Sequence, residues 1–315
     1  VSLADSEFTG IGEAAPSAYY DESQEKVLET LALAPQVLED DPFDLEMLDR
    51  RLQHTMRSSA AARAAVDIAL HDLAAQRLGI PLYRLFGLNA SQTPLTSFTI
   101  GIDDLDVIRH KVREADGYPI LKVKLGAGND LEIVQVIREE TDAVIRIDAN
   151  AGWTVPKAKS LIPALADLGV ELIEQPLPAD DYEGLKTLRA ESLLPIFVDE
   201  SVLMASDVPR LAGCVDGVNI KLMKCGGLRE ALRLIHTARA HGMQVMLGCM
   251  IETSVAITAA AHLSPLADYA DLDGNLLISN DPYRGVQVEA GRLVLPGGPG
   301  LGLQKVSPEP YNGTL

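Results

Sequence analysis

The sequence predicts an α/β fold: a (β/α) barrel of the TIM type with an α+β capping domain built from the N-terminal segment and the C-terminal tail. The first supporting observation is the alternation, from Leu95 onward, of apolar strand-like runs with amphipathic helical stretches such as 130–140 and 228–241. The second is the number of runs, eight within residues 95–275. The third is that no G-x-G-x-x-G motif follows a strand, which counts against the rival doubly wound sheet.

The elements follow in a regular order along the chain. A long Ala-rich helix is expected over 58–78, because Ser58 or Ser59 can cap its start and Gly79 with Pro81 ends it. The predicted barrel strands are TSFTIG (96–101), ILKVKLG (120–126), AVIRIDAN (143–150), ELIEQP (171–176), IFVDES (196–201), GVNIKL (217–222), QVMLGCM (244–250) and DYADLDG (268–274).

These elements divide the chain into three parts. Residues 1–94 are predicted to form the N-terminal part of the capping domain, whose start we expect to be truncated because the chain begins at Val1 without a Met. Residues 95–275 are predicted to form the catalytic barrel. Residues 276–315 read as short strands and turns, and we expect this tail to return to the capping domain.

Composition limits the partners and the compartment. The chain of 315 residues is 47% hydrophobic, enough for a large core, and its net charge of −18 argues against binding to nucleic acid or anionic membranes. Its longest apolar stretches, such as 243–251, are far short of the ~20 residues of a membrane span. The cysteines form no CxxC pair, which predicts a reducing cytoplasm. They are Cys214, Cys225 and Cys249.

Three carboxylates end three successive predicted strands. Asp148, Glu174 and Asp199 are spaced 26 and 25 residues apart, the length of one strand–helix unit. In a barrel the carboxyl ends of the strands form the active face, so these acids are expected to lie together. A buried unpaired charge is costly, and three in register indicate a metal cage of hard oxygen ligands that suits Mg²⁺.

Lysines flank the predicted cage. Only ten lysines occur in the chain, and four fall in two strand-like stretches, which indicates a shared role: Lys122, Lys124, Lys221 and Lys224. Because side chains alternate along a strand, Lys122 and Lys124 share the inner face of one strand, as Asn219 and Lys221 do on another. Asp271 and Asp273 likewise point the same way on the last strand.

The order of the strands gives this pattern a chemical meaning. Strands two and six of an eight-stranded barrel lie opposite each other, and so do strands four and eight. The pair Lys122 and Lys124 would therefore lie opposite Lys221, and one lysine on each face of a planar enediolate would let one remove the α-proton and the other return it on the opposite face. The aspartates of the last strand would hold a cationic group across from the metal. This arrangement predicts epimerisation next to a carboxylate.

The motifs also resemble a known family. The sequence is similar to the enolase superfamily, muconate-lactonising subgroup, and DLDG with GCMIETS is closest to the dipeptide epimerases of the L-Ala-D/L-Glu type. The motifs that carry the resemblance are SAAARAAVDIALHDLAAQRLGIPLYRLFG (59–87), KVK (122–124), IDAN (147–150), IEQP (173–176), VDES (198–201), NIKLMKCGG (219–227), GCMIETSVAITAAAHL (248–263) and DLDG (271–274). Members of this superfamily pair a Lys or His base with Mg²⁺.

The resemblance implies a role for each matching residue. Asp148, Glu174 and Asp199 would bind Mg²⁺, Lys124 and Lys221 would be the acid/base pair, and the substrate would be a dipeptide epimerised at its C-terminal residue. The implied substrate-binding residues are Lys122 as an electrostatic helper and Asp271 with Asp273 for the ammonium group. Asn150, Gln175 and Glu200 would support the metal ligands. The resemblance also implies a homo-oligomer.

Two departures from the family pattern limit the prediction. No His lies in or near 244–250, which counts against a His base of the mandelate-racemase type. Only seven residues precede Phe8, so we expect that a specificity loop is missing from this sequence, and the preferred dipeptide stays open.

Other interpretations remain at this stage. The chain could catalyse a different superfamily reaction, of the o-succinylbenzoate synthase or muconate cycloisomerase type, on a substrate without an ammonium group. It could also be a non-catalytic metal-binding barrel. Lys221 could only pair with Asp199, and the two aspartates of DLDG could only cap a turn. Trp153 could line the site or pack in the core, and none of the six histidines is expected to be catalytic.

Overall fold

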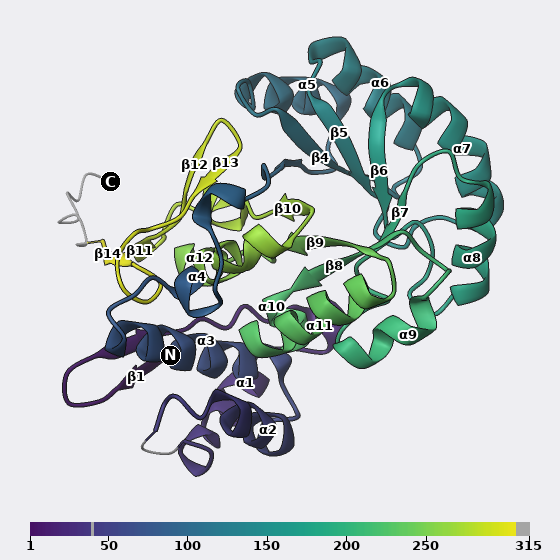
Figure 1. Cartoon of the computed structure of the whole chain (residues 1–315). Helices are drawn as coiled ribbons and strands as arrows, with labels where there is room; N and C mark the ends of the chain where they lie inside the picture. The colour runs from purple at the N-terminus through teal and green to yellow at the C-terminus, as the bar shows by residue number, and fades with distance from the viewer. Residues whose placement is uncertain (39–40, 307–315) are drawn as a thin grey trace.

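A computed structural model describes residues 1–38 and 41–306 and confirms the predicted barrel. Eight parallel strands form one sheet in which β3 to β10 are neighbours in chain order (Figure 1). A parallel bridge between Thr96 and Ala270 joins the last strand to the segment before the first, so the sheet closes on itself. The closed ring places β4 opposite β8 and β6 opposite β10, as the strand count predicts.

The barrel strands are β3 (Phe98–Ile100), β4 (Ile120–Lys124), β5 (Val144–Asp148), β6 (Val170–Glu174), β7 (Ile196–Val198), β8 (Gly217–Lys221), β9 (Gln244–Gly248) and β10 (Tyr269–Asp271). The helices between and after them are α5 (Leu105–Glu114), α6 (Asp130–Glu140), α7 (Val155–Asp167), α8 (Tyr182–Glu191), α9 (Val208–Leu211), α10 (Leu222–Cys225), α11 (Leu228–Ala240) and α12 (Ser254–Leu263). Within the described residues, no helix has both the length and the hydrophobicity that a membrane crossing requires.

The remaining elements lie outside the barrel. On the N-terminal side they are β1 (Ser2–Ala4), β2 (Thr9–Ile11), η1 (Ala18–Tyr20), α1 (Gln24–Leu31), α2 (Leu45–Thr55), α3 (Ala60–Arg77) and α4 (Leu82–Leu85). In the tail they are η6 (Gly274–Leu277), β11 (Tyr283–Arg284), β12 (Gln287–Glu289), β13 (Arg292–Val294) and β14 (Gln304–Lys305). Figure 1 shows the yellow tail and the purple N-terminal hairpin on the same flank of the barrel.

The tail does return to the N-terminal segment. Leu301 N donates to Asp72 Oδ1 at 2.7 Å, and Leu82 N donates to Gly300 O at 2.8 Å. The backbone of one segment thereby satisfies groups of the other. The domain boundaries at 94/95 and 275/276 stay a prediction, and residues 307–315 of the expected tail lie outside the described residues.

Helix α3 joins the capping elements to the barrel. Its N-cap is Ser59, whose Oγ accepts from Ala62 N at 3.0 Å, one of the two caps that the sequence offers. Small alanines make most of its surface flat, so β2 packs directly on it. A Cβ added at Gly10 would lie 2.0 Å from Ala69 O, and only glycine permits this approach. The helix therefore holds the N-terminal hairpin against the rest of the molecule.

The inside of the barrel changes from apolar to charged along its axis. A small cluster of Leu172, Phe197 and Met246, with Tyr269 packed against it, fills the interior toward the amino ends of the strands. Gly217 leaves room there for the Phe197 ring, because a Cβ would lie 2.2 Å from the ring carbon Cε1. This apolar layer forms the floor beneath the charged residues at the carboxyl ends.

The floor gives a stability prediction. Gly217→Ala adds one methyl group to a closely packed barrel interior, so we expect the free energy of unfolding to fall by about 1–3 kcal/mol. Gly297→Ala is the control, since a Cβ there meets no atom within 4 Å. Urea unfolding followed by circular dichroism measures both. Equal stability of the two variants would show that Phe197 does not occupy this position.

Candidate active site

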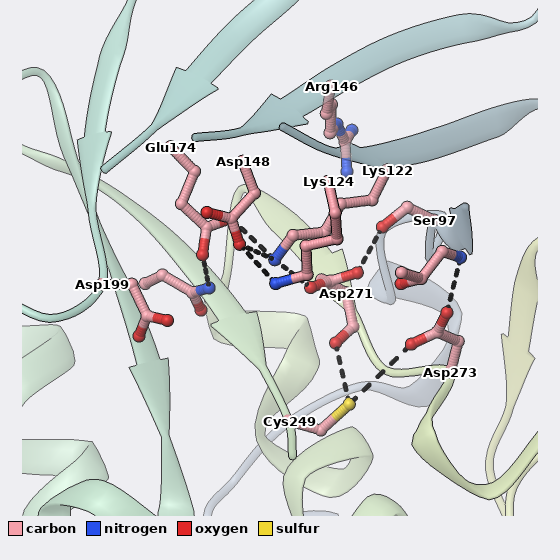
Figure 2. A network of polar contacts seen from close by, with 12 residues as sticks. Ser97, Lys122, Lys124, Arg146, Asp148, Glu174, Asp199, Cys249, Asp271 and Asp273 are labelled. Carbon is pink, nitrogen blue, oxygen red and sulfur yellow. Dashed lines mark hydrogen bonds and ion pairs between the residues drawn. The ribbon is translucent and has the colours of Figure 1, made fainter. Parts of the chain in front are cut away.

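The eight predicted site residues come together at the carboxyl-terminal end of the barrel, and Figure 2 labels all of them except Lys221, which pairs with Asp199. The strand register aligns Lys124 of β4 with Asp148 of β5, and Asp148 with Glu174 of β6. Asp199 lies one residue beyond β7 and Asp273 two residues beyond β10, because these two strands are shorter than the expected runs 196–201 and 268–274. Because all strands are parallel, these side chains converge on one mouth of the barrel.

Lys122 is the centre of this cluster. Its Nζ lies 2.7 Å from Asp271 Oδ2, 2.8 Å from Glu174 Oε2 and 3.2 Å from Asp148 Oδ2, and the side chain is 3% exposed. Burial alone would lower the pKa of this lysine, but the three surrounding carboxylates raise it well above its usual value. Lys122 therefore stays charged, and its positive charge is shared by one carboxylate from each of three strands, β5, β6 and β10.

The other two predicted lysines each pair with one carboxylate. Lys124 Nζ lies 2.7 Å from Asp148 Oδ2, and Lys221 Nζ lies 2.7 Å from Asp199 Oδ2. Burial would lower the pKa of Lys221, but Asp199 raises it. Lys124 is the more open of the two, with 28% of its side chain exposed. Since β4 and β8 face each other, these lysines approach the mouth from opposite sides.

Asp199 is held in place by Lys224, to which the sequence pattern assigned no individual role, and by Gln175. Lys224 Nζ donates to Asp199 O at 2.6 Å and also contacts its carboxylate. Gln175 Oε1 accepts from Asp199 N at 2.9 Å, so this residue supports the Asp199 loop as the sequence suggested. Burial would raise the pKa of Asp199, but Lys221 and Lys224 lower it, which keeps the carboxylate charged.

The chemistry of the donor set fits a divalent cation. The cluster brings six carboxyl groups together with four lysines, a formal excess of two negative charges: Asp148, Glu174, Asp199, Glu200, Asp271 and Asp273 against Lys122, Lys124, Lys221 and Lys224. Two acceptor oxygens beside the cluster, Asn219 Oδ1 and Glu200 Oε2, are buried without a hydrogen-bond partner. The lysines and backbone N–H groups at this site therefore do not supply a hydrogen-bond donor for every acceptor oxygen.

In the structure, lysine side chains bridge the carboxylates of the cluster. Among the described residues, no three His, Cys, Asp or Glu side chains are gathered so that they could hold an ion directly. Burial and the neighbouring Asp148 raise the pKa of Glu174, whereas Lys122 and Lys124 hold the pKa of Asp148 at about 2 against the effect of burial. Asp148, Glu174 and Asp199 are the residues that would hold a metal, after the lysine contacts rearrange.

The two aspartates of the last strand have different environments. Asp271 accepts from Ser97 Oγ at 2.7 Å and is bound to Lys122, so it belongs to the central network. Asp273 accepts from Thr99 N at 2.7 Å, and within the described part of the chain no lysine forms an ion pair with it. Burial, and after it the charge of Asp271, raise the pKa of Asp273 to about 6. Of the two, Asp273 has the carboxylate that remains available to a ligand.

Ser97 and Thr99 were missed by the sequence interpretation. Both lie in TSFTIG, where the alternation that placed the lysines inward also places these two residues inward. A charged residue inside a predicted barrel strand, such as Lys122 or Lys124, is unusual and indicates a site, whereas Ser and Thr are common in strands and give no such signal.

A cavity of about 380 Å³ opens above the cluster. Of the predicted residues, the three lysines and both aspartates line it, whereas Asp148, Glu174 and Asp199 lie beneath the lysines. Its lining residues are Pro16, Ser17, Thr99, Lys122, Lys124, Lys221, Cys249, Met250, Ile251, Asp271, Asp273 and Leu277. Pro16 and Ser17 come from the capping segment, so the cap closes one side of the cavity.

Three remaining expectations can be placed. Trp153 packs in the core and donates from Nε1 to Asp130 Oδ2 at 2.9 Å, so the alternative that it lines the site is wrong. Asn150 N donates to Asp148 Oδ1 at 3.0 Å, and its positive φ of 45° turns the chain at the end of β5. His71 and His262 are buried outside the cavity, consistent with packing roles.

A closed parallel barrel with lysines on opposite strands, carboxylates between them and an N-terminal cap over the mouth defines an enolase-like barrel enzyme. Comparison with family models agrees with this class. The model described as "Enolase C-terminal domain-like" matches residues 107–306, and the one described as "Mandelate racemase / muconate lactonizing enzyme, N-terminal domain" matches residues 1–87. The chain belongs to the enolase superfamily, in its mandelate racemase/muconate-lactonising group.

Within this superfamily, the chain is similar to several proteins that are named as epimerases of dipeptides. The chain is 47% identical to an L-Ala-D/L-Glu epimerase of Bacteroides thetaiotaomicron over 95% of its own length and 78% of the relative. It is 40% identical to a hydrophobic dipeptide epimerase of Roseobacter litoralis, over 96% of this chain and 90% of that one. A crystal structure of a dipeptide epimerase from Enterococcus faecalis, complexed with Mg and L-Leu-L-Tyr, has a TM-score of 0.91, 38% identity, and coverage of 96% and 90%.

The network around Lys122 gives a second stability prediction. Lys122→Met leaves three buried carboxylates without their shared cation, so we expect the free energy of unfolding to fall by about 3–5 kcal/mol in EDTA. Lys159→Met removes an exposed pair with Glu191 at 2.9 Å and should cost less than about 1 kcal/mol. Urea unfolding measures both. Similar small losses for both lysines would contradict a central role for Lys122.

Proposed function

We propose that the protein is a Mg²⁺-dependent dipeptide epimerase that inverts the α-carbon of the C-terminal residue. The observation that carries the proposal is the placement of Lys124 and Lys221 on opposite strands of the barrel, with the acids Asp148, Glu174 and Asp199 between them. The epimerase names of the relatives and the Mg and dipeptide in the Enterococcus faecalis structure support the same activity.

The acidic residues form two groups, one for the metal that binds the substrate carboxylate and one for the substrate ammonium group. Asp148, Glu174 and Asp199 would hold Mg²⁺ on one side of the cavity. When bound, Mg²⁺ would neutralise the carboxylate charge that the lysines now balance, and would stabilise the negative charge that develops on the substrate carboxylate. Asp273 lies across the barrel, where its carboxylate would accept hydrogen bonds from the dipeptide ammonium group, with Asp271 adding negative charge behind it.

The lysines then transfer the proton. One lysine amine takes the α-proton from one face of the carbon, and the ammonium of the other returns a proton to the opposite face. Lys122, buried beneath them with three carboxylate contacts, keeps its charge and adds positive potential near the enediolate. After the transfer the first lysine loses its extra proton to solvent and the second lysine regains one from solvent, so both return to their starting protonation states over the catalytic cycle.

The Asp pair argues against the alternative superfamily reactions. A substrate of the o-succinylbenzoate synthase or muconate cycloisomerase type carries no ammonium group, and the Asp273 carboxylate would then face it unpaired. Assembly into a homo-oligomer and a cytoplasmic location also remain proposals, which rest on the family resemblance and on the unpaired cysteines. The charge of −18 supports the absence of nucleic acid among the partners.

The two-lysine mechanism is tested by α-proton exchange in D₂O. We expect the protein with Mg²⁺ to exchange the α-proton of both epimers of an L-Ala-L-Xaa dipeptide, and EDTA to stop the exchange. Lys124→Met should lose exchange on one epimer by about 10²-fold or more and keep it on the other, and Lys221→Met should show the opposite pattern. Lys159→Met serves as the surface control. Full exchange of both epimers by both single variants would overturn the assignment.

The raised pKa of Asp273 predicts a pH dependence of substrate binding. Below its pKa of about 6 the carboxyl is neutral, and above it the carboxylate can bind an ammonium group. The Michaelis constant KM for a dipeptide should therefore fall by about tenfold from pH 5 to pH 7. Asp273→Asn should remove this inflection, and so should a substrate analogue that lacks the amino group. A KM that rises with pH in the wild type would contradict the ammonium role.

A further inference from the structure

A small recess lies beside the main cavity. Its volume is about 100 Å³, and it shares two lining residues with the cavity, Ser17 and Met250. The capping segment, the start of α3 and the region around α10 enclose it. Its lining residues are Ala15, Ser17, Tyr20, Glu22, Ala60, Ala61, Leu203, Met223, Lys224 and Met250.

The proposed reaction directs one substrate group toward this recess. When the α-carbon loses its proton it becomes planar, and the two lysines occupy the two faces of that plane. Within the plane, the carboxylate points to the acids at the ends of β5 to β7, and the amide nitrogen leads toward Asp273 after β10. The third in-plane direction leads out of the barrel toward the cap, and the recess adjoins the cavity on this side at Ser17 and Met250, next to the ends of β8 and β9. The side chain of the epimerised residue would enter the recess from there.

The walls of the recess are mostly apolar. Ala61 and Met223 are 1% and 3% exposed, and with Met250 and Leu203 they present methyl, methylene and thioether groups. At roughly 30 Å³ per water molecule, the volume equals about three waters, or a side chain of three or four carbon atoms. Such a site gains free energy by covering apolar surface and loses it when it strips water from a charge.

The charged groups that line the recess already form hydrogen bonds and ion pairs within the protein. Lys224 Nζ donates to the backbone oxygens of Asp199, Val202 and Asn219 at 2.6, 3.1 and 3.1 Å and contacts the Asp199 carboxylate as well. Its side chain is 1% exposed. No donor of this lysine is left for a substrate carboxylate.

The N-terminus of α3 is the other feature that would attract an anion, and Glu22 occupies it. Glu22 Oε1 accepts from Ala60 N at 2.6 Å, and Oε2 accepts from Ser59 Oγ at 2.5 Å. The helix dipole is thus satisfied by this chain's own carboxylate. A second carboxylate entering the recess would meet the negative charge of Glu22.

From these contacts we propose that the recess binds the side chain of the epimerised residue and selects uncharged aliphatic side chains over acidic ones. The inference rests on the proposed epimerase function and adds the substrate class. It separates this chain from the L-Ala-D/L-Glu epimerase that it resembles at 47% identity, and places it nearer in specificity to the relative named for hydrophobic dipeptides.

A matched dipeptide series tests the proposal. With Mg²⁺ in D₂O, the α-proton exchange rates of L-Ala-L-Val, L-Ala-L-Leu, L-Ala-L-Gln and L-Ala-L-Glu are compared at equal concentrations. We expect kcat/KM for L-Ala-L-Leu to exceed that for L-Ala-L-Glu by about tenfold or more. Fastest exchange on L-Ala-L-Glu would overturn this inference and leave the epimerase proposal intact. No exchange on any dipeptide would overturn both.

Two variants assign the preference to the recess. Leu203 is 40% exposed, so Leu203→Arg adds a cation at the recess edge and should raise kcat/KM for L-Ala-L-Glu relative to L-Ala-L-Leu. Met223→Ala enlarges the recess and should favour L-Ala-L-Phe. Met47→Ala, a methionine of α2 that is 42% exposed and outside both cavities, is the matched control. If neither recess variant changes the relative rates, the side chain binds elsewhere.

Discussion

The ion network centred on Lys122 is the interaction on which the rest of the site depends. Six carboxyl groups are gathered at one end of the barrel, where an unpaired charge is costly. Lys122 connects Asp148, Glu174 and Asp271 from the interior, and its neighbours Lys124 and Lys221 cover the cluster from the cavity. The lysines stabilise the cluster in the protein, and the excess of acceptors over lysines makes it attractive to a divalent cation.

The apolar floor and the charged layer above it are linked by contacts of Tyr269 and Arg146. The rings of Phe197 and Tyr269 pack edge to face at 5.2 Å, and the Arg146 guanidinium lies 4.8 Å from the centroid of the Tyr269 ring. Arg146 also lies 2.6 Å from Glu171, so its charge is balanced on the side away from the mouth. Because the floor fills the barrel interior, the lysine side chains lie above it, and their amines contact the carboxylates at the ends of the strands.

The recess proposed to select the substrate side chain is built by the cap and the barrel together. Six of the ten residues that line the recess come from the segment before α1 and from the start of α3, and the other four follow β7, β8 and β9, whereas the acids and lysines lie on the strands or directly after them. The contact of Glu22 with Ser59 and Ala60 ties the two cap segments together at this point. In the proposed function, residues of the strands would transfer the proton, and the cap together with the segments after β7, β8 and β9 would select the side chain.

The sequence by itself determined the barrel, its strand order and the set of charged residues, since alternation and strand spacing are local properties of the chain. Only the tertiary structure decided that Asp271 pairs with Lys122 while Asp273 stays without a lysine, that Trp153 belongs to the core, and that Lys224 is buried against Asp199. It also brought Ser97 and Thr99 beside the aspartates. These contacts join residues far apart in the chain, and their electrostatic balance depends on burial and on distances that no spacing along the sequence encodes.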